Sequence, residues 1–272
     1  MGLGLDLSES RNKLTRAAEH LHALDEEIRI ALDQAGANEG RLGEADPNTG
    51  WYPIYIARKE IPKITQMRIS VLVGDAIHNM RCALDYIISE LVVASGASIE
   101  RRHQFPVIED PLQYEQQIWR YGEPIGRGSL RNVKHGLAEI EFLQPYHTHP
   151  SPDHSSLWTI NRFSNYDKHR NMTSQFSILG SGPIEMTFGG ANPTAARQFT
   201  QRNWNSDGDI LVAAFRFDRP PPEAQIKAQM SQMVVVTVGK TERDQLGRGI
   251  NTRGFTTICN DVRAIIDQFE RL

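Results

Sequence analysis

Apolar residues recur at steps of three and four between residues 64 and 95, and this stretch constrains the fold more than any other. The repeat matches the 3.6-residue turn of an α-helix. One face of the predicted helix carries Ile77, Met80, Leu84, Ile88 and Leu91. A separate stripe is polar and carries Asp75, His78, Arg81, Asp85 and Ser89. A helix with such a wide apolar face must bury it against other elements, so the sequence predicts a helical bundle.

Further stretches share the helical period. Residues 8–35 and 252–271 predict amphipathic helices near the two ends of the chain. Residues 155–169 predict another helix, which follows a loop rich in His, Pro and Ser. Shorter helices are expected at 111–120 and 129–143. Most of the chain up to about residue 170 is therefore expected to be helical.

The second part of the chain has a different pattern. Short β-branched and aromatic runs there alternate with turns rich in Gly, Asn and Pro, which is typical of antiparallel strands. The predicted strands are 175–179, 184–188, 210–217 and 233–238. Residues 36–50 are expected to form a loop. Residues 51–60 follow it as an extended arm, in which Pro53 favours an edge strand because proline has no N–H to donate.

These patterns predict an α+β fold. Residues 1–170 would form a helical bundle region with an extended arm at 51–60. Residues 171–272 would form a small antiparallel sheet plus a C-terminal helix, packed with the first region as one unit.

Composition narrows the classes of protein that fit. The 272 residues are 39% hydrophobic and 23% charged, which excludes a disordered or collagen-like chain. Thirty Lys and Arg against 33 Asp and Glu give a net charge of −3, so a strongly basic nucleic-acid coat protein is excluded. The two cysteines are expected as reduced thiols. With no signal-like N-terminus and no uninterrupted apolar span, we expect a cytoplasmic protein without membrane contact.

The polar stripe of the helix at 64–95 permits two interpretations. Arg81 and Asp85 are four residues apart and are expected to pair. The stripe is flanked by apolar residues, so it is not expected simply to face water, and buried charges need partners. It is either a partly buried ion-pair network that fixes how helices pack, or a ligand-binding face that includes Asp75 and His78.

A second polar stripe is predicted on the helix at 155–169. Asn161, Arg162, Asn165 and His169 share one face, with Lys168 at its edge. Asn is a poor interior helix residue, so two of them at i,i+4 call for an explanation. One interpretation is a polar network that ties this helix to the Arg81–Asp85 stripe. The other is an anion or phosphodiester site, in which His169 would move protons. We expect the two stripes to be neighbours.

Two other groups of residues are not expected to form a functional site. The loop with His147, His149, Asp153 and His154 holds metal-ligand types, but it is extended by two prolines and is expected to be solvated; we predict no metal and no cofactor. The four tryptophans are expected to be packing residues because they are scattered along the sequence rather than interleaved with basic residues. They are Trp51, Trp119, Trp158 and Trp204.

Residues 74–85 read GDAIHNMRCALD and residues 161–170 read NRFSNYDKHR. These runs, together with Phe105-Pro106 and Gln144-Pro145-Tyr146, resemble the GDxxHNxRxALD and NxxSNxDKHR motifs of a group of uncharacterised bacterial proteins, many of them actinobacterial. The resemblance covers roughly residues 10–180. It implies no activity.

Arg162, followed after six residues by His169, is also similar to the signature of HEPN domains. Those are helical bundles that often act as metal-independent ribonucleases. The resemblance implies that His169 acts as acid or base, that Arg162 stabilises charge on the phosphate, and that the site forms across a homodimer. Phe163 stands where that family usually has a polar residue.

Two functions therefore follow as expectations. In the first, the paired stripes are structural or bind a small anionic ligand or a partner that the sequence does not identify. In the second, the chain is an HEPN-like ribonuclease that uses Arg162 and His169 and takes RNA as its partner.

Overall fold

A computed structural model describes residues 3–35, 38–56, 61–120, 123–124, 128–167, 173–204, 209–222, 224–237 and 250–272. The fold is α+β, as predicted. The chain divides into two compact units. The helical unit combines Met1–Glu27, Met67–Thr173 and Val236–Leu272, and the sheet unit combines Ile28–Gln66 and Ser174–Val235. The C-terminal helix belongs to the helical unit, whereas the arm predicted at 51–60 belongs, in its described part, to the sheet unit.

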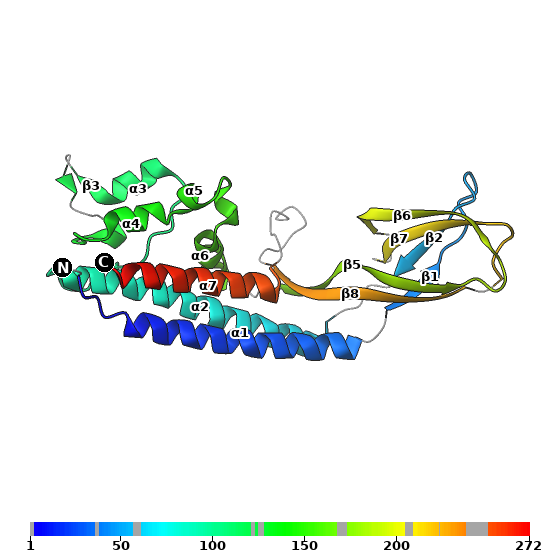
Figure 1. The fold of residues 1–272 in the computed structure, drawn as a ribbon, viewed down its shortest axis with the longest axis horizontal. Helices are drawn as coiled ribbons and strands as arrows, with labels where there is room; N and C mark the ends of the chain where they lie inside the picture. Colours follow the sequence, from blue (N-terminus) through cyan, green and yellow to red (C-terminus); the bar gives the residue numbers. More distant parts are fainter. Residues whose placement is uncertain are drawn as a thin grey trace. The chain divides into compact units, whose positions relative to one another are not determined.

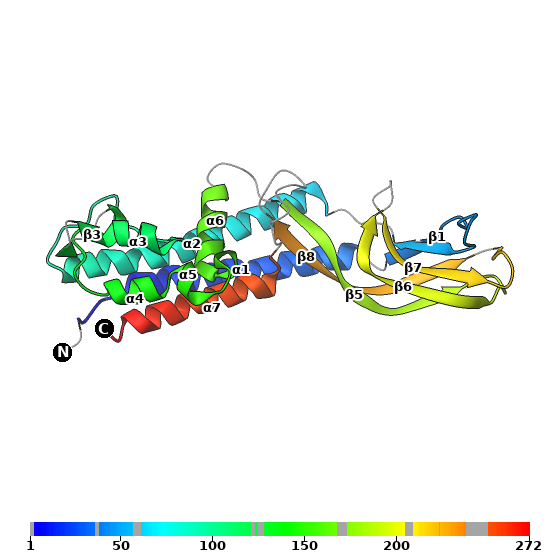
Figure 2. The same cartoon turned by 90° about the horizontal axis from the view of Figure 1, so that it is seen from above.

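Three helices run side by side in the helical unit (Figures 1 and 2). They are α1 (Ser8–Ala35), α2 (Lys63–Ala94) and α7 (Thr252–Phe269). All three lie within two residues of their predicted bounds. The apolar face of α2 is completely buried, from Ile77 through Met80, Leu84 and Ile88 to Leu91. No described helix combines the length and the apolarity that a membrane span requires.

Hydrogen bonds and ion pairs join the N-terminal and C-terminal parts of the chain within the helical unit. The Leu3 N–H donates to the carbonyl of Leu272 at 2.7 Å. Arg11 of α1 donates to Asp267 at 2.6 Å and to Glu270 at 2.5–2.7 Å. The Arg11 guanidinium holds the pKa of the Glu270 carboxyl below its usual value, because the hydrogen bonds favour the charged form. Cys82 and Cys259 are not joined by a disulfide, as expected.

Short elements cover one side of these helices. They are α3 (Pro111–Ile118), β3 (Trp119–Arg120), β4 (Glu123–Pro124), η1 (Gly128–Leu130), α4 (Leu137–Phe142), α5 (Pro145–Thr148), η2 (Pro152–His154) and α6 (Ser156–Asp167). The prediction of a single helix over residues 129–143 is wrong, because η1 and α4 are the only helical segments in this stretch. Gly136, at the start of α4, has a φ of 73°, which a continuous right-handed helix does not allow.

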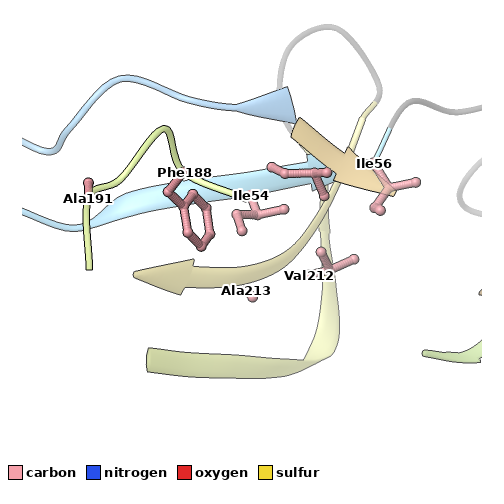
Figure 3. Packing of buried hydrophobic residues seen from close by; sticks show 7 residues of the cluster. Ile54, Ile56, Phe188, Ala191, Val212 and Ala213 are labelled. Atoms are coloured by element: carbon pink, nitrogen blue, oxygen red, sulfur yellow. The ribbon is translucent and has the colours of Figure 1, made fainter. Parts of the chain in front are cut away.

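The sheet unit contains six antiparallel strands in the order β5-β8-β1-β2-β7-β6. The strands are β1 (Asn38–Leu42), β2 (Tyr52–Ile56), β5 (Thr173–Thr187), β6 (Pro193–Trp204), β7 (Ile210–Phe217) and β8 (Gln225–Thr237). Strand β7 matches its prediction, and the two strands predicted at 175–188 are one strand. The apolar side chains of Ile54, Ile56, Phe188 and Val212 form the core of this unit (Figure 3).

Two strand predictions fail at Gly40 and Pro53. The sequence predicts a loop over residues 36–50, but Gly40 lies in β1, opposite Ile226 of β8. This strand position holds a glycine because an added Cβ would lie 2.4 Å from the Cγ2 atom of Ile226. Pro53 lies in an interior strand rather than an edge strand. Its carbonyl accepts from Gly43 at 2.7 Å, so its nitrogen faces the end of β1, where the last paired residue is Leu42. No ladder bond to β7 is lost.

We predict that Gly136→Ala destabilises the protein more than Gly96→Ala. Both glycines have a φ of 73°, so each alanine adds about 1–2 kcal/mol of backbone strain. An added Cβ at Gly136 would also lie 3.1–3.2 Å from Phe269 and Leu91, whereas the space at Gly96 is open. We expect an additional loss of about 1–3 kcal/mol at Gly136, measured by urea unfolding. Equal losses for the two variants would contradict the close packing of α2 and α7 around this turn.

Candidate functional site

The polar stripe of α2 divides into an exposed part and a half-buried part. Asp75 and His78 are exposed, and the Nε2 atom of His78 lies 3.5 Å from the Sγ atom of Cys82. Arg81 and Asp85 are half-buried and form the expected ion pair at 3.2 Å. The stripe is therefore not one continuous ligand-binding face.

Arg81 and Asp85 together hold one residue of a distant segment. Arg81 Nη2 donates to the carbonyl of Phe105 at 2.6 Å, and Asp85 Oδ1 accepts from the Phe105 N–H at 2.8 Å. Phe105 is completely buried, and it lies outside any strand or helix that would satisfy its backbone. A buried peptide group without partners is costly. The charged pair supplies both partners, which favours the structural interpretation for this half of the stripe.

The second predicted stripe lies on α6. Asn165 donates to Asn161 at 3.5 Å, along the expected i,i+4 row. The Arg162 guanidinium lies over the ring of Trp158, 4.9 Å from its centroid. Arg162 makes no ion pair with a carboxylate among the described residues, so its charge is not neutralised there. Lys168 and His169 lie outside the described residues.

Neighbouring segments hold α6 in place. Ser155 caps the helix by accepting from the Trp158 N–H at 3.1 Å, and the Trp158 indole N–H donates to Glu109 at 2.8 Å. Phe163 packs edge-on against Phe255 of α7, with 5.7 Å between the ring centroids. Because Trp158 is held by both its backbone and its ring, the position of Arg162 over it is also restricted.

The two stripes are not joined through the described side chains of α6. Asn161 and Asn165 bond to each other, and Arg162 contacts Trp158; none of the three bonds to the α2 stripe. The expectation that the stripes are neighbours therefore remains a prediction.

A cavity of about 370 Å³ lies between α7 and the segment that leads into α6. Its polar lining includes His149, His154, Ser156, Asp261 and Gln268. Ser156 donates to the Asp261 carboxylate and so links α6 to α7 across the cavity wall. None of the described residues that line the cavity is Lys or Arg, so the described lining does not extend the cationic face of α6. Sequence reasoning missed this cavity because its walls come from segments far apart in the chain.

The His-rich loop before α6 does not gather its side chains into a metal site. The rings of His149 and His154 lie 4.7 Å apart, and His147 lies 3.9 Å from Glu141 instead. Within the described ranges, no group of three or more His, Cys, Asp or Glu residues is arranged to hold a metal ion.

The packing role expected of the tryptophans stays a prediction, and two of them lie against arginines. Trp158 contacts Arg162, and Trp51 contacts both Arg197 and Arg216, with guanidinium carbons 4.4 Å and 5.0 Å from its ring centroid. Aromatic and basic residues therefore do alternate in space at these two positions. The sequence hid the Trp51 cluster because β6 and β7 supply its arginines.

No protein-family model, curated protein or solved structure matches this chain. The function therefore has to be argued from the chemistry of the residues themselves.

We predict that Asp85→Ala lowers the free energy of unfolding by about 2–3 kcal/mol, because it removes the acceptor for the Phe105 N–H and leaves Arg81 without its ion-pair partner. Asp75→Ala, on an exposed turn of the same helix, is the matched control and should change stability by about 0.5 kcal/mol or less. Urea unfolding measures both. A small loss at Asp85 would contradict the structural role of the pair.

Proposed function

We propose that the protein binds an anionic ligand through the polar face of α6. Arg162 is the principal cation of this site, and Asn161 and Asn165 supply amide donors beside it. Lys168, which follows directly after α6, adds a second positive charge in this proposal.

The observation that carries the proposal is the set of contacts that the Arg162 side chain makes. Its guanidinium stacks on Trp158 and makes no ion pair with a described carboxylate. Stacking uses the flat face of the group and leaves its N–H edge available for hydrogen bonds. An arginine held in this way loses little conformational freedom when it binds a carboxylate or a phosphate in a bidentate manner.

The contrast with α2 supports this assignment. Arg81 is committed to Asp85 and to the Phe105 carbonyl, so its charge serves the packing of the helical unit. The sequence makes Asp75, His78, Arg81 and Asp85 all candidates for ligand binding. In our proposal the ligand is bound by α6, and Arg81 and Asp85 are structural.

We predict that Arg162→Gln weakens the binding of inorganic phosphate about tenfold, because it removes a charge-assisted hydrogen bond. NMR of arginine Nε–Hε groups during a phosphate titration measures this at each arginine. The matched control is Arg263→Gln on α7, an exposed arginine that donates to Asn260 and stacks on no described aromatic ring. In the wild type, a saturable shift at Arg162 and not at Arg263 supports the site. Equal weak shifts at both arginines would indicate only general charge attraction and would overturn it.

A second candidate function is cleavage of RNA at the same face. The similarity of Arg162 and His169 to the HEPN signature motivates it, and an arginine that pairs with no described carboxylate suits the role of stabilising charge on a phosphate. In this proposal His169 transfers the proton of the 2′-hydroxyl or of the leaving oxygen.

We predict that, if this second function holds, the protein cleaves single-stranded RNA in the presence of EDTA, and that His169→Ala reduces the rate by a factor of about 10² or more. Arg162→Gln should slow cleavage as well as weaken binding. Gel analysis of a labelled RNA measures the rate. Equal absence of cleavage by the wild type and by His169→Ala would reject the ribonuclease and leave the anion-binding proposal standing.

A further inference from the structure

One aromatic ring of the sheet unit carries two arginines. Trp51, directly before β2, has Arg197 of β6 at 4.4 Å and Arg216 of β7 at 5.0 Å from its ring centroid. The two guanidinium carbons are therefore no farther apart than the sum of these distances. Like charges at such a separation repel each other, and the contact with the ring offsets only part of that repulsion.

The cluster lies on the face of the sheet that points away from its core. Ile54 and Ile56 are completely buried, and side chains alternate along a strand, so Trp51, Pro53 and Tyr55 share the opposite face. The register places Pro53 opposite Ala214, and Ala214 opposite Arg197. Arg216 is two positions from Ala214 on β7 and shares this face. Arg197 and Arg216 are both exposed.

The charges of these two arginines are not neutralised within the described chain. Neither makes an ion pair with a described carboxylate; Arg216 donates only from Nε, to the Thr49 carbonyl at 2.9 Å. The nearby Asp46 carboxylate accepts instead from the N–H groups of Asn48 and Thr49, which lower its pKa. The outer N–H edges of both guanidinium groups are thus available to an anion.

A second stack on the same face provides an internal comparison. Arg41 lies 5.0 Å from the ring centroid of Tyr55, but it also pairs with Asp209 at 2.8 Å. Two guanidinium–aromatic stacks are therefore described on this face, and of these two the one at Trp51 has no described carboxylate partner. Trp51 and Tyr55 are about 13 Å apart along β2.

From this arrangement we propose that the face around Trp51, Arg197 and Arg216 binds single-stranded nucleic acid. Phosphate oxygens accept hydrogen bonds from the two guanidinium groups, and bases stack on the flat guanidinium and aromatic surfaces. A single strand offers both phosphates and exposed bases at short intervals, whereas an acidic peptide offers no planar rings to stack. This inference does not rest on the proposed role of α6, which lies in the other unit.

The test is fluorescence anisotropy of two labelled single strands of about 12 nucleotides, one oligo(dT) and one 2′-O-methyl RNA. Neither strand has the 2′-hydroxyl that RNA cleavage requires, so nuclease activity does not disturb the measurement. We expect the double variant Arg197→Gln/Arg216→Gln to bind at least one strand about tenfold more weakly than the wild type. We also expect the slope of log affinity against log salt to fall by about 1–2.

Three comparisons of variants separate binding at Trp51 from general charge attraction. Arg41→Gln should change affinity by less than about threefold, because Asp209 already neutralises Arg41. Arg263→Gln, an exposed arginine of α7 in the helical unit, should leave binding unchanged. Trp51→Phe should retain binding better than Trp51→Leu, because phenylalanine keeps an aromatic ring on which the arginines can stack and leucine does not. Circular dichroism melting curves check that each variant folds.

Three results would overturn the proposal. The first is no binding of either strand at about 100 µM protein, a concentration that detects even weak nonspecific affinity. The second is equal affinity of the wild type and the Arg197→Gln/Arg216→Gln variant. The third is displacement of the strand by a polyglutamate peptide at a lower concentration than by unlabelled oligo(dT), which would identify an acidic protein segment as the occupant.

Discussion

The burial of the apolar face of α2 is the constraint on which the helical unit depends. Ile77, Met80, Leu84, Ile88 and Leu91 are all completely excluded from water. Each such side chain contributes about 1.5–3 kcal/mol to folding. The position of α2 then decides what its polar residues can reach. Arg81 and Asp85, at the border of the buried face, meet the backbone of Phe105 and satisfy it.

Two sets of arginines in this chain differ in their neighbours. Arg11, Arg41 and Arg81 each pair with a carboxylate, so their charges are used within the fold. Arg162, Arg197 and Arg216 lie against indole rings and have no described acid partner. A guanidinium group on an aromatic face keeps its full charge and its outer donors. The second set is therefore where we propose that external anions bind.

The sequence predicts well those elements whose pattern is local. Helices α1, α2 and α7 and strand β7 lie close to their predicted positions because apolar period and end signals lie within each segment. Strand β1 is missed because Gly40 has the composition of a loop residue, although it is required by the close approach of Ile226. The helix expected at 129–143 fails at Gly136, whose left-handed conformation accommodates Leu91 and Phe269. Both of these errors involve a glycine whose role is set by a residue in a distant segment.

The same distinction between local patterns and contacts with distant segments explains which parts of the candidate sites could be predicted. The Arg81–Asp85 pair is predictable because i,i+4 spacing on a helix brings two side chains together. The contact of this pair with the Phe105 peptide is not predictable, because nothing in the sequence near Phe105 indicates which helix it contacts. A packing role is predicted for Trp51 because the tryptophans are scattered along the sequence rather than interleaved with basic residues. Its arginines arrive through the pairing of β2 with β7 and of β7 with β6.

The Trp51 cluster also illustrates why net charge is a poor guide to anion binding. A chain with a net charge of −3 repels a polyanion weakly at long range, but salt at 0.15 M screens that repulsion beyond about 8 Å. Within that distance only local charges act. Two guanidinium groups on one ring, neither paired with a described carboxylate, can replace the cations that condense on a phosphodiester chain, and the release of those cations is a gain in entropy. An acidic protein can therefore hold nucleic acid wherever its fold gathers arginines away from its acids.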